Sequence, residues 1–193
     1  VVESLLRENG KVVGVRTGRE DGDIRADVVI AADGVNSLIA RDAGLHAELR
    51  PDHVALAVKE VIALPREKIE DRFNLEPGQG VAIELVGEAT ARMLGTAFIY
   101  TNQDSLSVGV GAIASEFAAS GIKPYELIEQ LKAHPAVRPL VAGGEVKEYM
   151  AHLIPEGGYK AIPKLYADGL LVVGDAAMLV NSLHREVSNL AMT

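Results

Sequence analysis

The strongest constraint on the fold is a pair of short apolar segments that each end in an acidic residue beside a glycine. Residues 28–34 read Val-Val-Ile-Ala-Ala-Asp-Gly, and residues 170–175 read Leu-Leu-Val-Val-Gly-Asp. A short, continuous apolar run that is bounded by a turn suits a strand buried on both faces of a layered α/β domain. We therefore expect both segments to be strands of such a domain, with a turn at the end of each.

The sequence around these two strands extends the α/β pattern. Asn9 and Gly10 supply the positive φ that a tight hairpin turn needs. Asn36 or Ser37 is expected to cap a short helix after the first apolar run. The expected elements of these flanking parts are strands at 1–6, 11–17, 24–32 and 170–173, and helices at 36–43 and 182–193.

The middle of the chain has a different order, in which strands come first and helices follow. The expected strands are 54–63, 80–86, 91–100, 105–113 and 145–153, and the expected helices are 65–72, 115–119, 124–134 and 135–141. This order is typical of an α+β lobe with a mostly antiparallel sheet. The predicted fold class is therefore α/β plus α+β, in which residues 1–50 and 164–193 form one lobe and residues 51–163 form an inserted lobe.

Composition excludes several classes of function. The 193 residues carry 27 acidic against 19 basic side chains, a net charge of −8 that argues against nucleic-acid binding and against strong attraction to an anionic bilayer. There is no cysteine, so this sequence has no disulfide, no thiolate nucleophile and no Cys-ligated cluster. No apolar run approaches the ~20 residues of a membrane-spanning helix. We expect no metal site, since His46, His53 and His152 lack partners at ligand spacing.

Asp175 is the most informative single position. It follows a buried strand, at the point where open α/β sheets bind ligands, and its carboxylate can accept hydrogen bonds from sugar-like hydroxyls. Gly174 lets a ligand approach the backbone, and the small Ala176 and Ala177 are expected to leave room above the strand end. The alternative is that the Gly-Asp pair only forms a turn and caps the next segment.

The context of Asp175 resembles a known family. Residues 170–177 closely resemble the second flavin-binding motif of FAD-dependent oxidoreductases with the glutathione-reductase-like fold. Residues 178–193 read Met-Leu-Val-Asn-Ser-Leu-His-Arg-Glu-Val-Ser-Asn-Leu-Ala-Met-Thr and resemble the FixC and electron-transfer-flavoprotein:quinone oxidoreductase family. The resemblance implies FAD as the cofactor and a role for Asp175 in holding its ribityl chain. It also implies that further cofactor contacts come from Gly174, Ala176, Ser188 and Asn189.

The first apolar strand carries a second resemblance. Residues 32–37 read Ala-Asp-Gly-Val-Asn-Ser and resemble the Asp-Gly motif of FAD-dependent hydroxylases and reductases. The resemblance implies that Asp33 and Gly34 lie near the FAD pyrophosphate. Arg41, on the following helix, can pair with Asp33, reach a phosphate, or make an ordinary surface ion pair.

Two further segments resemble the same family. His184, Arg185 and Glu186 are candidates for contact with a quinone or partner protein, or they form a solvated cluster at a helix start. Residues 155–159 read Pro-Glu-Gly-Gly-Tyr, in which Tyr159 either flanks the flavin or belongs to a connecting loop. One position departs from the family, because Val187 stands where the pattern predicts glycine, and this departure bears on flavin affinity.

The resemblance implies an FAD-binding lobe split by a substrate-side or quinone-side lobe, in a chain that covers only part of the family. The N-terminal dinucleotide-binding unit, with its Gly-x-Gly-x-x-Gly loop, is expected to be missing. The implied activity is electron transfer from an electron-transfer flavoprotein to a quinone or ferredoxin-like acceptor. The expected location is cytoplasmic, with peripheral membrane contact if a quinone is the acceptor. The alternatives are a non-catalytic truncated homologue without flavin and a geranylgeranyl-reductase-like or hydroxylase-like flavoenzyme; the catalytic residues are left open.

Overall fold

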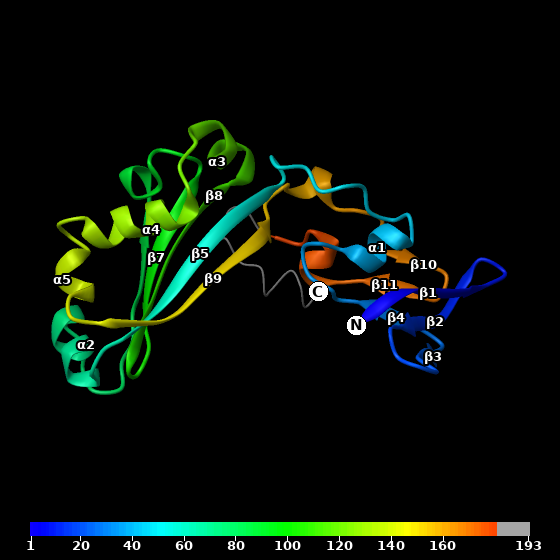
Figure 1. Cartoon of the computed structure of the whole chain (residues 1–193), viewed down its shortest axis with the longest axis horizontal. Helices are drawn as coiled ribbons and strands as arrows, with labels where there is room; N and C mark the ends of the chain where they lie inside the picture. The colour runs from blue at the N-terminus through cyan, green and yellow to red at the C-terminus, as the bar shows by residue number, and fades with distance from the viewer. Residues whose placement is uncertain (181–193) are drawn as a thin grey trace. The chain divides into compact units, whose positions relative to one another are not determined.

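The chain folds into two compact units in a computed structural model, which describes residues 1–180 (Figure 1). Of the described residues, the first unit contains 1–54 and 154–180, and the second contains Ala55–Leu153. The sequence predicted lobe boundaries at residues 50 and 163, and these stay predictions. Because Ile154 falls near the end of a strand, the lobe boundary has no turn signal in the sequence.

The first unit opens with a three-stranded antiparallel sheet. Its strands are β1 (Val2–Glu8), β2 (Lys11–Thr17) and β3 (Asp23–Arg25), in the order β1-β2-β3. The predicted hairpin is confirmed, since Asn9 and Gly10 have φ values of 51° and 83° between β1 and β2. Leu5 and Val12 point from this sheet into the core of the unit.

A second small sheet of this unit joins segments from both ends of the chain. Its order is β10 (Tyr166–Ala167), β11 (Leu170–Val172) and β4 (Val29–Ala31), and β11 runs parallel to β4. The turn after each parallel strand therefore lies at the same edge of the sheet.

The prediction of a single strand at 24–32 is wrong, because this segment contains two strands, β3 and β4. Ala26 donates to the carbonyl of Val13 in the first sheet, whereas Val29 donates to the carbonyl of Gly169 in the second, so the chain changes sheets between them. The prediction that this strand is buried on both faces is also wrong for the described residues. Ala31 is buried, but Val28 and Ile30 remain 53% and 62% exposed, because described residues cover only one face of β4.

The covered face holds the core of the first unit. The short helix α1 (Leu38–Asp42) packs against β1 and contributes Ile39 and Ala40 to this core. The buried apolar residues of this core are Leu5, Val12, Ala31, Ile39, Ala40, Leu170, Val172, Ala176 and Ala177. Both predicted apolar strands therefore contribute to one core, as the α/β interpretation requires.

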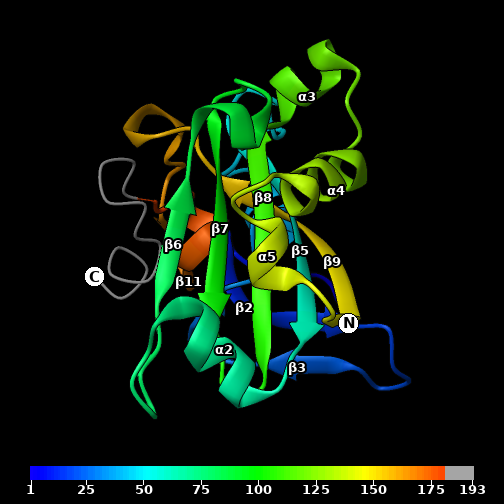
Figure 2. The ribbon, with the colours of Figure 1, turned by 90° about the vertical axis from the view of Figure 1, so that its left-hand side faces the viewer.

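The second unit is a five-stranded sheet covered by helices, as predicted for the inserted lobe. Figure 2 shows the sheet with α2, α4 and α5 on its near side. The strand order is β6-β7-β8-β5-β9, with bounds β5 (Val54–Ala63), β6 (Ala82–Leu85), β7 (Gly95–Thr101), β8 (Ser105–Ile113) and β9 (Glu145–Pro155). The pairs β6–β7, β7–β8 and β5–β8 are antiparallel. The strand expected at 91–100 begins only at Gly95, because a 3₁₀ turn (Gly87–Thr90) and two left-handed residues, Ala91 and Arg92, precede it.

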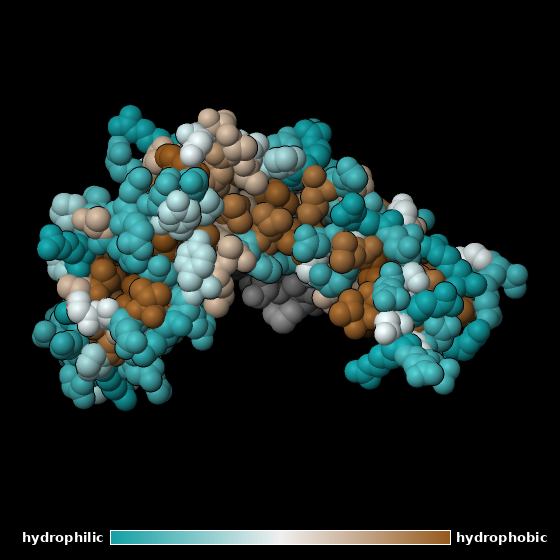
Figure 3. All heavy atoms as spheres, viewed as in Figure 1, coloured by the Kyte–Doolittle hydropathy of each residue, from teal (hydrophilic) through white to brown (hydrophobic). Residues whose placement is uncertain are grey.

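Four α-helices belong to this unit: α2 (Arg66–Phe73), α3 (Ala114–Ser120), α4 (Pro124–Ala133) and α5 (Arg138–Val141). Leu127, Ile128 and Leu131 of α4 pack with strand residues such as Val58 and Val108 in a core separate from that of the first unit. Exposed apolar side chains remain on both units within a mostly polar surface (Figure 3). Within residues 1–180, no helix is both long and apolar enough to span a membrane.

Candidate functional site

The two Asp/Gly turns that the sequence singled out lie side by side. Val172 pairs with Ala31 in the parallel register of β11 and β4, and Val173 donates a 3.0 Å hydrogen bond to the Ala31 carbonyl. Asp33 and Asp175 therefore follow neighbouring strands at one sheet edge. This is the position at which open α/β sheets bind ligands.

Backbone conformation at both turns depends on glycine. Gly34 and Gly174 have φ values of 77° and 63°, in the left-handed region that glycine adopts without steric cost. A Cβ built at either position would meet no atom of residues 1–180 within 4 Å. Among residues 1–180, nothing fills the space directly beside either glycine.

A buried hydrogen bond joins the two turns directly. The Ser37 hydroxyl lies 2.9 Å from the carbonyl oxygen of Ala176, 139 positions further along the sequence, and donates to it. Ser37 is fully buried and has left-handed dihedral angles, with φ 48° and ψ 39°. Ser37 was considered in the sequence only as a helix cap, so this connection was missed. A serine after an Asp-Gly turn predicts such a hydrogen bond only weakly, unless the register of the two strands is known.

Asp33 performs the capping that was expected of Asn36 or Ser37. Its Oδ2 accepts a 2.9 Å hydrogen bond from the backbone N–H of Ile39, in the first turn of α1. Ser37 occupies the position before the helix but makes no side-chain capping bond. One carboxylate oxygen of Asp33 therefore orders the turn, although the residue itself is exposed.

Arg41 forms the ordinary surface ion pair among its three possible roles. Its Nη2 lies 3.8 Å from a carboxylate oxygen of Glu48, whose side chain is 92% exposed. The pairing of Arg41 with Asp33 is not seen, because Asp33 binds the helix backbone instead.

The residues after Gly174 form a tight 3₁₀ turn, Gly174–Ala177. Asp175 is half-buried there, and its carbonyl accepts a 3.0 Å hydrogen bond from Met178 N–H. Ala176 and Ala177, which were expected to leave room above the strand end, are both fully buried in the core of the unit. Their small side chains instead allow this turn to pack closely against α1 and the strands.

Tyr159 lies on the surface of the first unit. It begins a 3₁₀ turn, Tyr159–Ala161, and its side chain is 89% exposed. Gly157, two residues before this turn, packs so closely against Ala161 that a Cβ would overlap its side chain. The structure thus places Tyr159 in the same unit as the two turns, on a connecting loop.

Several predicted site residues lie outside the described part of the chain. These are His184, Arg185, Glu186, Ser188 and Asn189, together with Val187 and the helix expected at 182–193. Within residues 1–180, no group of three or more potential metal ligands is close enough to hold an ion.

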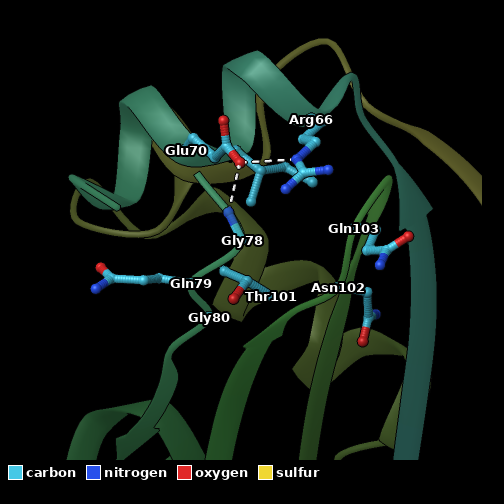
Figure 4. A pocket seen from close by; sticks show the side chains of 9 residues that line it. Arg66, Glu70, Gly78, Gln79, Gly80, Thr101, Asn102 and Gln103 are labelled. Atoms are coloured by element: carbon cyan, nitrogen blue, oxygen red, sulfur yellow. Dashed lines mark hydrogen bonds and ion pairs between the residues drawn. The ribbon is translucent and has the colours of Figure 1, made fainter. Parts of the chain in front are cut away.

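A polar pocket in the second unit was not predicted (Figure 4). It has a volume of about 230 Å³ and lies between α2, the loop at 78–80 and the β7–β8 turn. Glu70 Oε1 accepts hydrogen bonds from Arg66 Nε at 2.8 Å and from Gly78 N–H at 3.3 Å. The hydrogen bond from Arg66 holds the pKa of Glu70 below its usual value. The pocket therefore contains a fixed ion pair, surrounded by amide and hydroxyl groups from Gln79, Thr101, Asn102 and Gln103.

Comparison with known proteins places the chain in a family. No family model matches it. It is 56% identical over 193 residues to the protein FixC of Bradyrhizobium diazoefficiens, which covers all of this chain and 44% of that protein. It is 43% identical over 176 residues to a probable electron transfer flavoprotein-quinone oxidoreductase, YdiS, of Escherichia coli, covering 91% of this chain and 41% of that one. The chain belongs to the FixC and electron-transfer-flavoprotein:quinone oxidoreductase family. It spans less than half the length of these relatives.

Solved structures support the fold. A geranylgeranyl bacteriochlorophyll reductase-like protein of Thermoplasma acidophilum superposes with a TM-score of 0.71 at 22% identity, over 93% of this chain and 42% of that one. The flavin-dependent brominase Bmp2 superposes with a TM-score of 0.70 at 18% identity, over 99% of this chain and 46% of that one. At these identities the similarity concerns the fold, a mixed α/β architecture shared with flavin-dependent enzymes.

The residues at the paired turns fit one part of an FAD molecule. The space beside Gly34 and Gly174, which no atom of residues 1–180 fills, leaves room for a ligand near the backbone, and the Asp175 carboxylate suits hydroxyl groups such as those of a ribityl chain. The 193 residues contain no Gly-x-Gly-x-x-Gly sequence that could form a phosphate cradle. These residues thus suit a contact to the ribityl part of FAD, and the phosphate cradle of that motif is not among the 193 residues.

Proposed function

We propose that this chain forms part of an FAD-dependent oxidoreductase that takes electrons from an electron-transfer flavoprotein and passes them to a quinone or a ferredoxin-like protein. The observation that carries the proposal is the junction of the two Asp/Gly turns at the end of β4 and β11, tied by Ser37 and Ala176. The name of one sequence relative, the probable electron transfer flavoprotein-quinone oxidoreductase YdiS, supports both the flavoprotein donor and the quinone acceptor.

In this proposal the first unit is a split FAD-binding lobe with a glutathione-reductase-like fold. Asp175 holds the ribityl chain, and Asp33, Gly34, Gly174 and the backbone of Ala176 border the cofactor. Bound FAD supplies the redox chemistry, and the protein residues position it and control its surroundings. Ser188 and Asn189 are proposed as further cofactor contacts. Tyr159, His184, Arg185 and Glu186 are proposed to face the substrate or a partner protein.

The second unit is proposed to contact the electron acceptor. Its sheet and helices form a core of their own, so it can vary in sequence without disturbing the FAD lobe. With a quinone as the acceptor, this unit would contact the cytoplasmic surface of a membrane peripherally.

A chimera tests the proposal. The 193 residues would replace the matching segment of Bradyrhizobium FixC, which supplies the remaining length. The purified chimera is expected to show flavin absorbance, which bleaches when reduced electron-transfer flavoprotein is added without oxygen and returns with a soluble quinone. Dithionite provides the control for a reducible flavin. A flavin that dithionite bleaches but the reduced flavoprotein does not would contradict the proposed electron donor.

Two alternatives predict different results. The likeness to the geranylgeranyl bacteriochlorophyll reductase-like structure favours a reductase of polyprenyl groups, which predicts flavin oxidation by a geranylgeranyl substrate instead of a quinone. The other alternative, a non-catalytic homologue without flavin, predicts that the 193-residue chain alone binds no FAD.

A further inference from the structure

We propose that Ser37 is a positioning residue, which couples the two cofactor-facing turns so that FAD affinity depends on a side chain that does not touch FAD. This inference rests on the proposed function. The coupling itself is a property of the fold and can be measured without FAD.

The first argument concerns the hydrogen bond itself. Ser37 is fully buried, and its hydroxyl can donate only one hydrogen bond. Three carbonyl oxygens lie within reach, those of Gly34 at 3.4 Å, Val35 at 3.2 Å and Ala176 at 2.9 Å. The shortest of these connects the turn after β4 to the turn after β11. The other two lie within the first turn and add no connection between the segments.

The second argument concerns the backbone. Ser37 has φ 48°, a conformation that costs a non-glycine residue about 1–2 kcal/mol. Glycine would adopt this conformation freely, and a Ser side chain in its place therefore needs a compensating interaction. The hydrogen bond to the Ala176 carbonyl supplies that interaction.

The third argument concerns what the bond controls. The turn at 174–177 sets the direction of Asp175, and the turn at 33–37 sets that of Asp33 and Gly34. Without the Ser37 hydroxyl, the buried Ala176 carbonyl loses its side-chain donor, and the two turns lose the hydrogen bond that joins them. Loss of the hydroxyl is therefore expected to misplace Asp175 relative to Gly34.

Two variants of Ser37 separate positioning from folding. Ser37→Ala removes the hydroxyl and keeps the strained backbone, whereas Ser37→Gly removes the hydroxyl and relieves the strain. Thr90→Val is the matched control, since Thr90 is also fully buried and its hydroxyl donates to a carbonyl, that of Met93 at 2.8 Å, in the other unit.

The experiment measures FAD affinity on the flavin-free FixC chimera, by titration with FAD and flavin fluorescence. Both Ser37 variants are expected to weaken FAD binding about tenfold, and Thr90→Val by less than about twofold, where tenfold corresponds to ~1.4 kcal/mol at 25 °C. Unchanged affinity in the Ser37 variants, or an equal loss in Thr90→Val, would overturn the positioning role.

Hydrogen exchange on the 193-residue chain gives a second readout that needs no flavin. Ser37→Ala is expected to speed amide exchange in peptides that cover 174–179 and to leave peptides of the second unit unchanged. Thr90→Val is expected to do the reverse. If the parent chimera binds no FAD, the proposed function fails, and the exchange result still decides whether Ser37 couples the turns. Unchanged exchange at 174–179 would overturn the coupling.

Discussion

The carboxylate of Asp33 accepts a hydrogen bond from the backbone N–H of Ile39, at 2.9 Å, and so fixes the start of α1. An acidic residue that sequence resemblance places beside a cofactor thus has a structural task as well. Asp33 also directly precedes Gly34, beside which no atom of residues 1–180 fills the space. Substitutions at Asp33 must therefore distinguish a role in folding from a role in binding.

Two substitutions of Asp33, by Asn and by Ala, separate the effect of its charge from the effect of its helix cap. Asp33→Asn keeps an oxygen that can accept from Ile39 N–H and removes the charge, whereas Asp33→Ala removes the cap and is expected to cost about 1 kcal/mol of the free energy of unfolding. Urea unfolding of the 193-residue chain measures both. Equal losses in the two variants would show that the charge, and not the cap, stabilises this turn.

Lys132 and Glu60 form the most buried ion pair of the second unit. Lys132 Nζ lies 2.7 Å from Glu60 Oε2, and the two side chains are 16% and 7% exposed. Lys132→Met leaves Glu60 buried without its cation, which is expected to cost about 3 kcal/mol of the free energy of unfolding. The double change Lys132→Met with Glu60→Leu is expected to recover most of that loss, because no unpaired charge remains.

The control for this ion pair is Lys147→Met. Its partner Glu145 lies 2.7 Å away, but both side chains are more than half exposed, so a loss below about 0.5 kcal/mol is expected. Urea titrations of the four proteins provide the comparison. A single-variant loss at Lys132 that is no larger than that at Lys147 would contradict the assignment of a buried pair.

The same lysine predicts a dependence on pH. Burial lowers the pKa of Lys132, but hydrogen bonds and charge from Glu129 and Glu60 outweigh it and raise the pKa above its usual value. A raised pKa in the folded state stabilises the fold below the unfolded pKa, and the contribution is lost as pH rises through the folded pKa. The parent chain is therefore expected to lose more stability than Lys132→Met as the pH rises above about 10.4, the pKa of an unfolded lysine. Parallel pH profiles would contradict this.

Gly169 turns β10 into β11 and packs directly on β2. Its φ is 76°, and a Cβ there would overlap the carbonyl oxygen of Val12. Gly169→Ala is expected to destabilise the first unit by about 3 kcal/mol, from backbone strain together with steric overlap. Gly121→Ala is the control, because Gly121 has a similar φ of 69° with open space around it and is expected to lose only about 1 kcal/mol. Thermal unfolding measures both, and equal losses would argue against the close packing at Gly169.

Most helices and strands could be predicted from the sequence, because neighbouring residues determine where they begin and end. The hairpin at Asn9 and Gly10, the strands β5 and β8, and the helix that begins at Pro124 all follow from turn residues or from apolar pattern. The change of sheet between Ala26 and Val29 was missed, because an apolar run does not reveal which neighbour each residue binds. The hydrogen bond from the Ser37 hydroxyl to the Ala176 carbonyl was missed as well, because the sequence does not show that the two turns are neighbours.

The apolar run also did not reveal that one face of β4 is exposed among the described residues. Ile30 pairs in register with Leu171, and the two side chains are 62% and 44% exposed. Ile30→Thr is expected to leave the unfolding temperature of the 193-residue chain within about 2 °C of the parent and to raise its solubility. Leu170→Thr, one residue from Leu171 but only 1% exposed, is expected to unfold the first unit. A large stability loss in Ile30→Thr would contradict the assignment of the exposed face.

The measurement that tests the central claim most directly is flavin retention by the FixC chimera and by its Asp175→Ala variant. Both proteins would be passed through gel filtration after incubation with FAD, and the visible spectrum would be recorded with Asp168→Ala as a control in a neighbouring turn. The account predicts flavin absorbance in the parent and in Asp168→Ala, and its loss in Asp175→Ala. Equal flavin content in all three proteins would contradict a cofactor site at the paired turns.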